Sequence, residues 1–520
     1  MKMTTEDLIA FVNQQFSYQA PVRSLWQTLA DNFYPERADF TATRNIGSEL
    51  SDSLLSSYPV LVRRDLANSF SAMLRDGDWF KIATNNEVDH SGQMWLDWAS
   101  KRLRRVMYDR DANFVRATKE GDHDFATFGQ AVISVEQNRQ YNGLLFRSWH
   151  LRDCAWWEDE NGKVCGVAIK WKPTRRQLIQ FFGESKLHPN VTKEIHLPKN
   201  QMAEHEVYRV FMPAEQYGED TPRKYVAMFI DPSNNHEIEK VFLDRKLFAV
   251  PRFQTIAGSA YAYSPATVAG LPDARMLQAM THTLMEAGER YARPPLIGTA
   301  KAVKSNIDLG PNGITWVDSE YDEKMGEALR TLKQDRGGFP IGLELRDGIL
   351  EVLSSAFYIN KISLPEVNRD MTAYEVQERM KQYRRENLPL FAPMEEEYNG
   401  QLCEMAFDLA FSMGMLGSPQ DVPESLRGQD VLFKFESPLS QDAEREKMTR
   451  FNQVSQMLAE AAQIKPGVEH NFNFDEALRD AIQGIGAPEK WLRSVEEVVQ
   501  TRQAEAMMMQ QQMAAEQNAA

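Results

Sequence analysis

The first candidates for chemistry are cysteine and histidine side chains that share one stretch of the chain. Cys154 and Cys165 precede His188, His196 and His205. Thiolate and imidazole are the ligands that zinc prefers, so a zinc site is one interpretation of this set. Zinc sites usually hold their ligands in close pairs, about two to five residues apart, and this spacing matches no such pattern. Surface histidines and buried structural cysteines are the other interpretation.

Other catalytic patterns are missing from the sequence. It contains no Gly-rich loop that ends in Lys-Ser/Thr and no Gly-x-Gly-x-x-Gly, the two common nucleotide-binding patterns. It has no Gly-x-Ser-x-Gly nucleophile motif. The carboxylate runs 395–397 and 496–497 are more typical of solvated helix faces than of acid–base pairs. We therefore expect no enzyme, no catalytic or metal-binding residues and no cofactor.

One basic cluster, Lys101-Arg102-Leu103-Arg104-Arg105, could contact nucleic acid. Acidic residues flank it at Asp97, Asp109 and Asp111, which also fits a solvated or inter-subunit helix face. The pair Trp156-Trp157 and the Met-rich segment 507–513 are more typical of core and interface than of a cofactor site.

The composition limits which partners are possible. The 520 residues include 59 Lys and Arg against 74 Asp and Glu, a formal charge of −15. This acidic balance argues against a protein that grips nucleic acid over its whole surface, but not against one that nucleic acid passes without sticking. With 42% apolar and 26% charged residues the chain is of ordinary globular composition, and its length suggests several domains.

The compartment follows from three further features. No apolar run approaches the roughly 18 residues that span a bilayer, so we expect no membrane contact. Acidic residues at Glu6 and Asp7 stand where a signal peptide would need an apolar core. Three cysteines, Cys154, Cys165 and Cys403, cannot form a disulfide framework for this length, which indicates a reducing, cytosol-like compartment.

Periodicity divides the first half of the chain into a helical layer and a β-rich region. Apolar residues from 6 to 119 recur at helical spacing, with breaks expected at Pro21, Pro35 and Pro59. Between 125 and 254 short β-branched and aromatic runs predict mostly antiparallel strands, at 131–135, 143–146, 154–157, 164–169, 207–211, 225–229 and 238–242. Asn161-Gly162 predicts a hairpin, and 174–182 predicts one embedded helix.

The second half is predicted to be mainly helical. A helix over 265–292 ends before Pro294-Pro295, and a second helix covers 341–359. Between them lies a small mixed unit with a turn at 311–313 and a short helix near 323–333. A loop containing Pro365 leads to the capping box Thr372–Glu375, where a long helix begins that Pro389 and Pro393 divide and that continues to about Gly414. Helices resume from Ser437.

This order of elements resembles a bacteriophage portal protein of the head-to-tail connector family of short-tailed phages (podoviruses). The resemblance covers nearly the whole chain and rests on five stretches in the right order: 25–37 with its Tyr-Pro exit, Trp79-Phe80, 263–273, 371–379, and 435–439. One departure is Tyr263, where a Gly-Arg-Ser-Pro-like run is expected, so contacts of that arginine are not carried over.

The resemblance implies an α+β portal fold. Its mixed helical and antiparallel-β wing would be residues 1–264 (a helical layer, then a β-rich domain) and the wing helices 372–436. The stem helices would be 265–292 and 341–359, the small clip insertion 293–340 and the tunnel loop 360–371. The helical C-terminal crown with its flexible tail would be 437–520.

The resemblance also implies a homo-oligomeric ring, commonly a dodecamer, at one capsid vertex of the virion, assembled in the bacterial cytoplasm. Double-stranded DNA would be packaged through it by a separate terminase motor, retained and then ejected. Scaffolding, major capsid and tail adaptor or tail tube proteins would be its partners. Lys361 and Arg369 in the tunnel loop would be placed to touch DNA, with a plain surface connection as the other interpretation. The alternatives are another ring component, such as a tail adaptor, and a nuclease or ATPase with unrecognised motifs.

Overall fold

The computed structural model describes residues 2–43, 47, 49–50, 54–75, 77–86, 88–195, 200–292, 296–298, 329–331, 338–362, 394–435, 441–465, 467, 472–484, 491–494 and 497–508. The chain forms two compact units, which are described separately. The sheet unit comprises Met1–Ser24, Leu66–Ser264 and Lys361–Ala520, and the helix-pair unit comprises Leu25–Asp65 and Pro265–Asn360.

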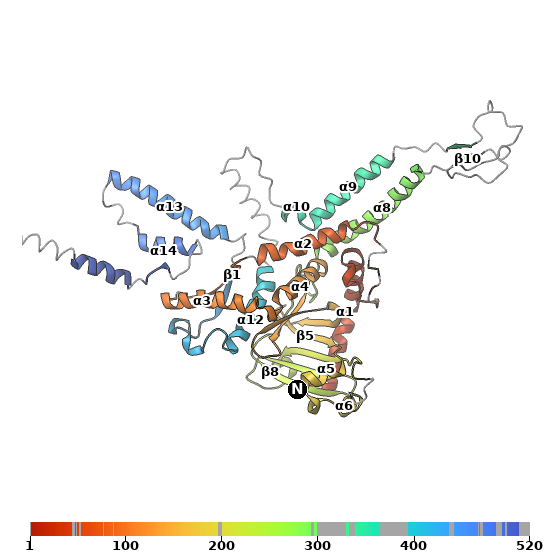
Figure 1. Cartoon of the computed structure of the whole chain (residues 1–520), viewed down its shortest axis with the longest axis horizontal. Coiled ribbons are helices and arrows are strands. Elements are labelled where there is room, and N and C mark those ends of the chain that lie inside the picture. The colour runs from red at the N-terminus through yellow and green to blue at the C-terminus, as the bar shows by residue number, and fades with distance from the viewer. Residues whose placement is uncertain are drawn as a thin grey trace, which may run out of the picture. The chain divides into compact units, whose positions relative to one another are not determined.

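The sheet unit is built on two antiparallel sheets (Figure 1). The larger has the order β4-β5-β6-β7-β8, with strands Cys154–Glu158, Val164–Trp171, Val207–Pro213, Tyr225–Asp231 and His236–Leu243. The smaller has the order β3-β2-β9, with strands Leu144–Trp149, Val132–Gln137 and Phe248–Ala249. Each strand is rich in β-branched and aromatic residues, which fit a pleated and half-buried surface.

Helices cover both faces of the larger sheet. The first turns of α1 (Thr5–Phe33) place Leu8, Val12 and Phe16 in a core with apolar side chains of β4 to β7. On the other face, α5 (Arg175–Phe182) and α6 (Pro189–Ile195) bury Leu178 and Val191 in a second core. Between β6 and β7 lies the short helix α7 (Ala214–Tyr217).

The remaining helices of the sheet unit lie before and after the two sheets in the sequence. They include α3 (His90–Met107) and α4 (Phe114–Phe128), which precede the sheets. The later ones are a π-helical turn (Glu395–Gly400), α12 (Gln401–Ser412), α13 (Gln441–Ile464) and α14 (Phe474–Gly484). Strand β12 (Val431–Phe435) pairs antiparallel with β1 (Phe80–Thr84), so residues about 350 positions apart form one ribbon. The Trp79 ring stacks against Phe435 at 6.2 Å between ring centres.

A buried ion pair ties the returning segment to the first helices. The guanidinium of Arg75 donates to both carboxylate oxygens of Asp122 on α4, at 3.0 and 2.8 Å, and its Nε donates to Oδ1 of Asn399 at 2.9 Å. The Arg75 and Asp122 side chains are each only 2% exposed. Burial alone would lower the pKa of Arg75, but the carboxylate of Asp122 raises it above the ordinary arginine value. The guanidinium therefore stays charged inside the protein.

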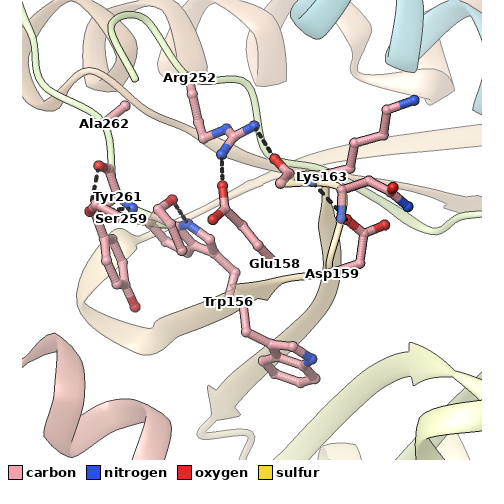
Figure 2. Close-up of polar contacts among 12 residues, drawn as sticks. Trp156, Glu158, Asp159, Lys163, Arg252, Ser259, Tyr261 and Ala262 are labelled. Carbon is pink, nitrogen blue, oxygen red and sulfur yellow. Dashed lines mark hydrogen bonds and ion pairs between the residues drawn. The ribbon is translucent and has the colours of Figure 1, made fainter. Parts of the chain in front are cut away.

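A second arginine joins the same returning segment to the larger sheet. Arg252 forms an ion pair with Glu158 at the end of β4 and donates to the carbonyl oxygen of Gly162 at 3.1 Å (Figure 2). Its other ion pair is with Glu397, at 3.1 Å. In the β4–β5 turn beside it, Oδ1 of Asp159 accepts from the backbone N–H of Lys163 at 2.9 Å. Arg252 thus fixes this turn against the segment that returns after residue 394.

The helix-pair unit consists mainly of two antiparallel helices side by side (Figure 1). A π-helical turn (Ala266–Gly270) leads into α8 (Leu271–Ala292), and its partner is α9 (Gly338–Ala356). The last residues of the unit begin the short helix α10 (Ile359–Ile362). Helix α2 (Tyr58–Leu74) starts in this unit. Strands β10 (Leu296–Gly298) and β11 (Leu329–Thr331), which lie between α8 and α9 in sequence, pair antiparallel with each other.

Most elements predicted from the sequence are present, and the α+β class is confirmed. Each of the seven predicted strands overlaps an observed strand, and the hairpin at Asn161-Gly162 joins β4 to β5 with Gly162 at φ +71°. Thr174 caps α5 through a capping box with Gln177. The capping box at Thr372–Glu375 and the prolines at 389 and 393 lie outside the described residues.

Three local predictions are wrong. Pro21 does not break the first helix, because α1 continues through it with buried side chains on both sides, such as Phe16 and Trp26. Residues 329–331 are a strand rather than part of a helix over 323–333, because they pair with β10. The predicted 360–371 loop begins inside α10, which includes residues 360–362.

The ion pair of Arg75 gives a stability prediction. Asp122→Ala should destabilise the chain by about 3–5 kcal/mol, because it leaves a buried guanidinium without its counter-ion. The matched control on the same helix is Arg116→Ala, which removes an ion pair with Glu120 whose side chains are 79% and 45% exposed. That pair should contribute at most about 0.5 kcal/mol. Chemical denaturation of both variants measures the difference, and equal effects would show that the buried pair does not hold the unit together.

Candidate functional site

The two residues predicted to touch DNA cannot be placed as a pair. Lys361 belongs to α10, at the end of the helix pair, whereas Arg369 lies outside the described residues. The prediction that both point toward DNA stays a prediction. The structure describes the residues that precede the 360–371 segment, and their contacts fix where this segment starts.

The end of α9 is anchored before the chain turns into α10. Leu353 and Phe357 are fully buried, and the Phe357 ring packs against Phe33 with 5.3 Å between ring centres. Tyr358 then takes a left-handed conformation with φ +59°, which ends the helix and redirects the chain. The segment beginning at α10 therefore departs from a rigid point within the helix-pair unit.

Close packing at the start of α8 contributes to this anchor. Gly270 ends the π-helical turn, and a Cβ atom there would lie 2.9 Å from Cε2 of Phe357 and 3.1 Å from Cζ of Phe33. Farther along, a Cβ on Gly342 of α9 would lie 2.9 Å from Cδ2 of Leu284 on α8. Glycine at these two positions lets the helix backbones approach aromatic and aliphatic side chains closely.

Residues 55–58, in the N-terminal part of this unit, form hydrogen bonds with both helices of the pair. Gln278 on α8 accepts from the backbone N–H groups of Leu55 and Ser56, both at 2.9 Å, and donates to the carbonyl oxygen of Ser56 at 2.8 Å. The hydroxyl of Tyr58 donates to the carbonyl oxygen of Leu350 on α9 at 3.2 Å. These partners are more than 200 residues apart, and no sequence pattern signals them.

The helix pair exposes apolar side chains on its surface. A groove of about 480 Å³ in this unit is lined mainly by leucines of α8, α9 and the segment 55–61. Large apolar side chains of the two helices are exposed at Met285 in this groove and, outside it, at Met276, Ile341, Leu345 and Val352. Such surface is typical of protein–protein contact.

The basic cluster does not form one cationic face. Arg104 is 9% exposed, donates to the carbonyl oxygen of Phe80 at 3.0 Å and pairs with Asp78 at 3.0 Å. Arg102 donates to the carbonyl oxygen of Met415 at 3.2 Å. Two of the four cations therefore hold the sheet unit together, which favours the structural interpretation of this cluster.

The cysteine and histidine set does not assemble either. Cys154 and Cys165 are buried, and Sγ of Cys165 accepts from Nε2 of Gln216 at 3.4 Å. His205 lies 3.1 Å from Asp231, His188 packs against His236, and His196 lies outside the described residues. Within the described part of the chain, no group of three or more His, Cys, Asp or Glu side chains could hold a metal ion.

Residues 7–492 match the model of a protein family described as the bacteriophage head to tail connecting protein. The chain belongs to this family. No curated protein matches the chain significantly. A head-to-tail connecting protein is a structural component of the phage particle and interacts in general with capsid and tail components. None of the connector's described helices is long and apolar enough to cross a membrane.

The anchor at Gly270 gives a testable pair of substitutions. Gly270→Ala should destabilise the connector by about 1–3 kcal/mol, because the added methyl overlaps two buried rings. The control is Gly288→Ala on α8, where a Cβ would meet no atom within 4 Å. That change should be neutral or stabilise the helix by up to about 1 kcal/mol. Thermal unfolding of both variants measures the contrast, and a stable Gly270→Ala variant would show that the rings can move aside.

Proposed function

We propose that this connector is the portal of a short-tailed phage. It forms a ring of identical subunits at one capsid vertex, and double-stranded DNA is packaged through the ring by a separate terminase motor, retained and ejected. The tail assembles onto the same ring. The family supports the general role of joining head to tail. The channel, the motor and the tail contact are what the resemblance to portal proteins of short-tailed phages implies.

The observation that carries the proposal is the order of elements along the chain, in which the helix pair and the β10–β11 strand pair interrupt the sheet unit. The chain leaves the sheet unit after Ser264, forms α8, the β10–β11 pair and α9, and then returns to the sheet unit. Within the sheet unit, the β1–β12 ribbon and the contacts of Arg75 and Arg252 join the segments that precede and follow this excursion. A helix pair inserted in this way has the stem–clip–stem order of the resembling family.

We assign the parts of the portal on this basis. Residues 1–264 and 372–436 form the wing, and 437–520 form the crown with its tail. The helices over 265–292 and 341–359 form the stem. Residues 293–340 form the clip, for which the pairing of β10 with β11 is the described support. Residues 360–371 form the tunnel loop, and α8 alone, with 22 residues at about 1.5 Å per residue, is long enough to line a passage.

Charge supports a passage that DNA can slide through. The two stem helices carry three arginines against six acidic residues, a formal −3 per subunit, from Asp273, Arg275, Glu286, Glu289, Arg290, Glu344, Arg346, Asp347 and Glu351. Because the whole chain carries −15, a ring of twelve subunits would carry about −180, which disfavours stable phosphate contacts. Cations such as Lys361 and Arg369 would then touch the DNA backbone only weakly.

Assembly is the first test of the portal. The purified chain should form a closed ring with a mass that is an integer multiple of 59.6 kDa. A head-to-tail interface that does not close would instead give filaments. Native mass spectrometry and negative-stain microscopy measure the state, and a protein that stays monomeric at high concentration and varied salt would contradict the portal assignment.

The tunnel loop gives a second test. A double variant with Lys361→Ser and Arg369→Ser should still form rings but should lower the yield of filled particles, because two phosphate-contacting charges are removed. The control is Lys119→Ser, which removes an exposed cation from α4 in the sheet unit. Packaged DNA per particle measures the effect. Unchanged yields would remove a DNA role for both loop cations, and loss of rings would make the loop a structural element.

A further inference from the structure

A polar groove lies between the two sheets of the sheet unit. It encloses about 1180 Å³, and its walls come from β2 and β3 on one side and from β5 to β8 and α5 on the other. This exceeds the roughly 300–1,000 Å³ of ordinary small-molecule sites, so a segment of polymer fits it better than a metabolite.

The groove is basic on a chain that is acidic as a whole. Its lining includes eight Lys or Arg residues against four Asp or Glu residues, a formal +4, whereas the whole chain carries −15. One of the eight, Lys170, directs its ammonium over the rings of Phe16 and Tyr208, at 4.4 and 5.3 Å, which belong to the core on the opposite face. Without Lys170 the groove still carries +3 and favours an anionic ligand.

Two arginines face each other around a single carboxylate in this groove. Arg209 pairs with Glu136 at 2.8 Å, and its guanidinium is held among the rings of Phe248, Phe229 and Trp149 at 4.9 to 6.0 Å. The Arg209 side chain is 8% exposed, yet its Nε has no hydrogen-bond partner among the described residues. A buried donor of this kind is costly unless a ligand completes it.

The second arginine, Arg147, is exposed on β3 and stacks on Trp149 with 3.9 Å from its guanidinium carbon to the ring centre. Although the side chain as a whole is exposed, the groove walls partly desolvate its guanidinium and thereby lower the pKa of Arg147. The carboxylate of Glu136 opposes this shift, and the positive charge of Arg209 adds to it. Glu136 can neutralise only one of the two cations, so an added anion beside Arg147 would be stabilised. A planar guanidinium stacked on an indole presents its edge to a carboxylate in a fixed orientation.

Apolar contacts lie beside these charges. Trp171, Phe181 and Phe229 form an aromatic cluster with 5.6 to 6.3 Å between ring centres, and Phe181 is 60% exposed. A ligand that reaches both the arginines and this cluster must therefore combine carboxylates with an apolar or aromatic side chain. Peptide segments offer this combination.

We infer that the groove around Arg147, Arg209, Trp149 and Phe181 binds an extended acidic peptide segment of another protein of the particle. This inference rests on the proposed function, because a connector at a capsid vertex must hold proteins other than its own copies. Recognition would combine a carboxylate on Arg147 and the free Nε of Arg209 with an aromatic side chain on Phe181, as in other sites where arginines read acidic motifs.

Duplex DNA and a second copy of the chain suit the groove less well. DNA binding draws on a continuous row of cations, whereas here Glu136, Asp153 and Glu239 interrupt the cations, and the exposed Phe181 ring offers an apolar contact that a phosphate backbone does not use. Contacts between copies are expected on the apolar surface of α8 and α9, where Met285, Ile341 and Leu345 are exposed. A charged groove is more typical of an interface whose electrostatics select a partner.

The test uses the full chain and a fluorescent peptide, Asp-Glu-Asp-Phe-Glu-Asp, with its Asn/Gln counterpart as the neutral probe. Fluorescence anisotropy should show saturable binding of the acidic peptide that weakens as salt is raised, and at least tenfold weaker binding of the neutral peptide. Arg147→Gln should weaken the acidic peptide about tenfold, because one charged hydrogen-bonding partner is lost. Phe181→Ser should weaken it as well, whereas Arg176→Gln, an exposed cation on α5 outside the groove, should not.

Several outcomes would overturn the inference. These are equal binding of both peptides, no binding up to about 1 mM (the weak end of measurable affinities), or an unchanged affinity in Arg147→Gln. Displacement of the peptide by a short DNA duplex would assign the groove to nucleic acid, and loss of ring mass in Arg147→Gln would assign it to a second copy. Ring mass is measured separately, so a monomeric chain that binds the acidic peptide would remove the portal proposal and leave the peptide site standing.

Discussion

The buried pair of Arg75 and Asp122 is the interaction on which the sheet unit depends. Both side chains are 2% exposed, so each charge is tolerated only while the other is in place. The third partner, Asn399, comes from a segment that the chain reaches only after α8 and α9. The Arg75 site is therefore complete only when both parts of the sheet unit have met. A long excursion between them is compatible with folding because closure entropy grows slowly with loop length.

Because these contacts join the two parts of the sheet unit, the helix pair between them in sequence is available for function. Helices α8 and α9 gain few buried side chains from each other, with Ala274, Leu277, Ile349 and Leu353 as the main ones. Their ends are fixed instead by neighbours within their own unit: Gln278 and Tyr58 along the pair, and Phe33 and Phe357 at its base. The apolar surface left exposed along the helices is then available to other subunits or partners without loss of the fold.

The elements that depend on local sequence patterns were predicted correctly from the sequence. The predictions failed where contacts with residues far away in the chain determine the structure. Alternating β-branched runs, the Asn161-Gly162 turn and the helix over 174–182 depend on patterns of a few residues, and each was predicted correctly. The β1–β12 ribbon joins residues about 350 positions apart, so that nothing in the local sequence of either strand indicates its partner. Pro21 within α1 and the strand at 329–331 show tertiary packing and pairing overriding local preference. Of the predicted site, the structure describes only the backbone around Lys361.

The distribution of cations separates two kinds of contact on one acidic chain. Arg75, Arg104 and Arg252 are turned inward and bind specific carboxylate oxygens. They therefore hold the sheet unit together and are not available to a partner protein. The stem helices carry an excess of acid, which lets an anionic polymer pass without being held. Arg147 differs from both, because it is exposed, stacked on Trp149 and beside a second arginine that shares its counter-ion. On a chain with a formal charge of −15, long-range repulsion keeps acidic partners away unless they meet such a local excess of positive charge. Selectivity for an acidic segment then follows from the contrast between the groove and the rest of the surface, since only a ligand that reaches the groove escapes that repulsion.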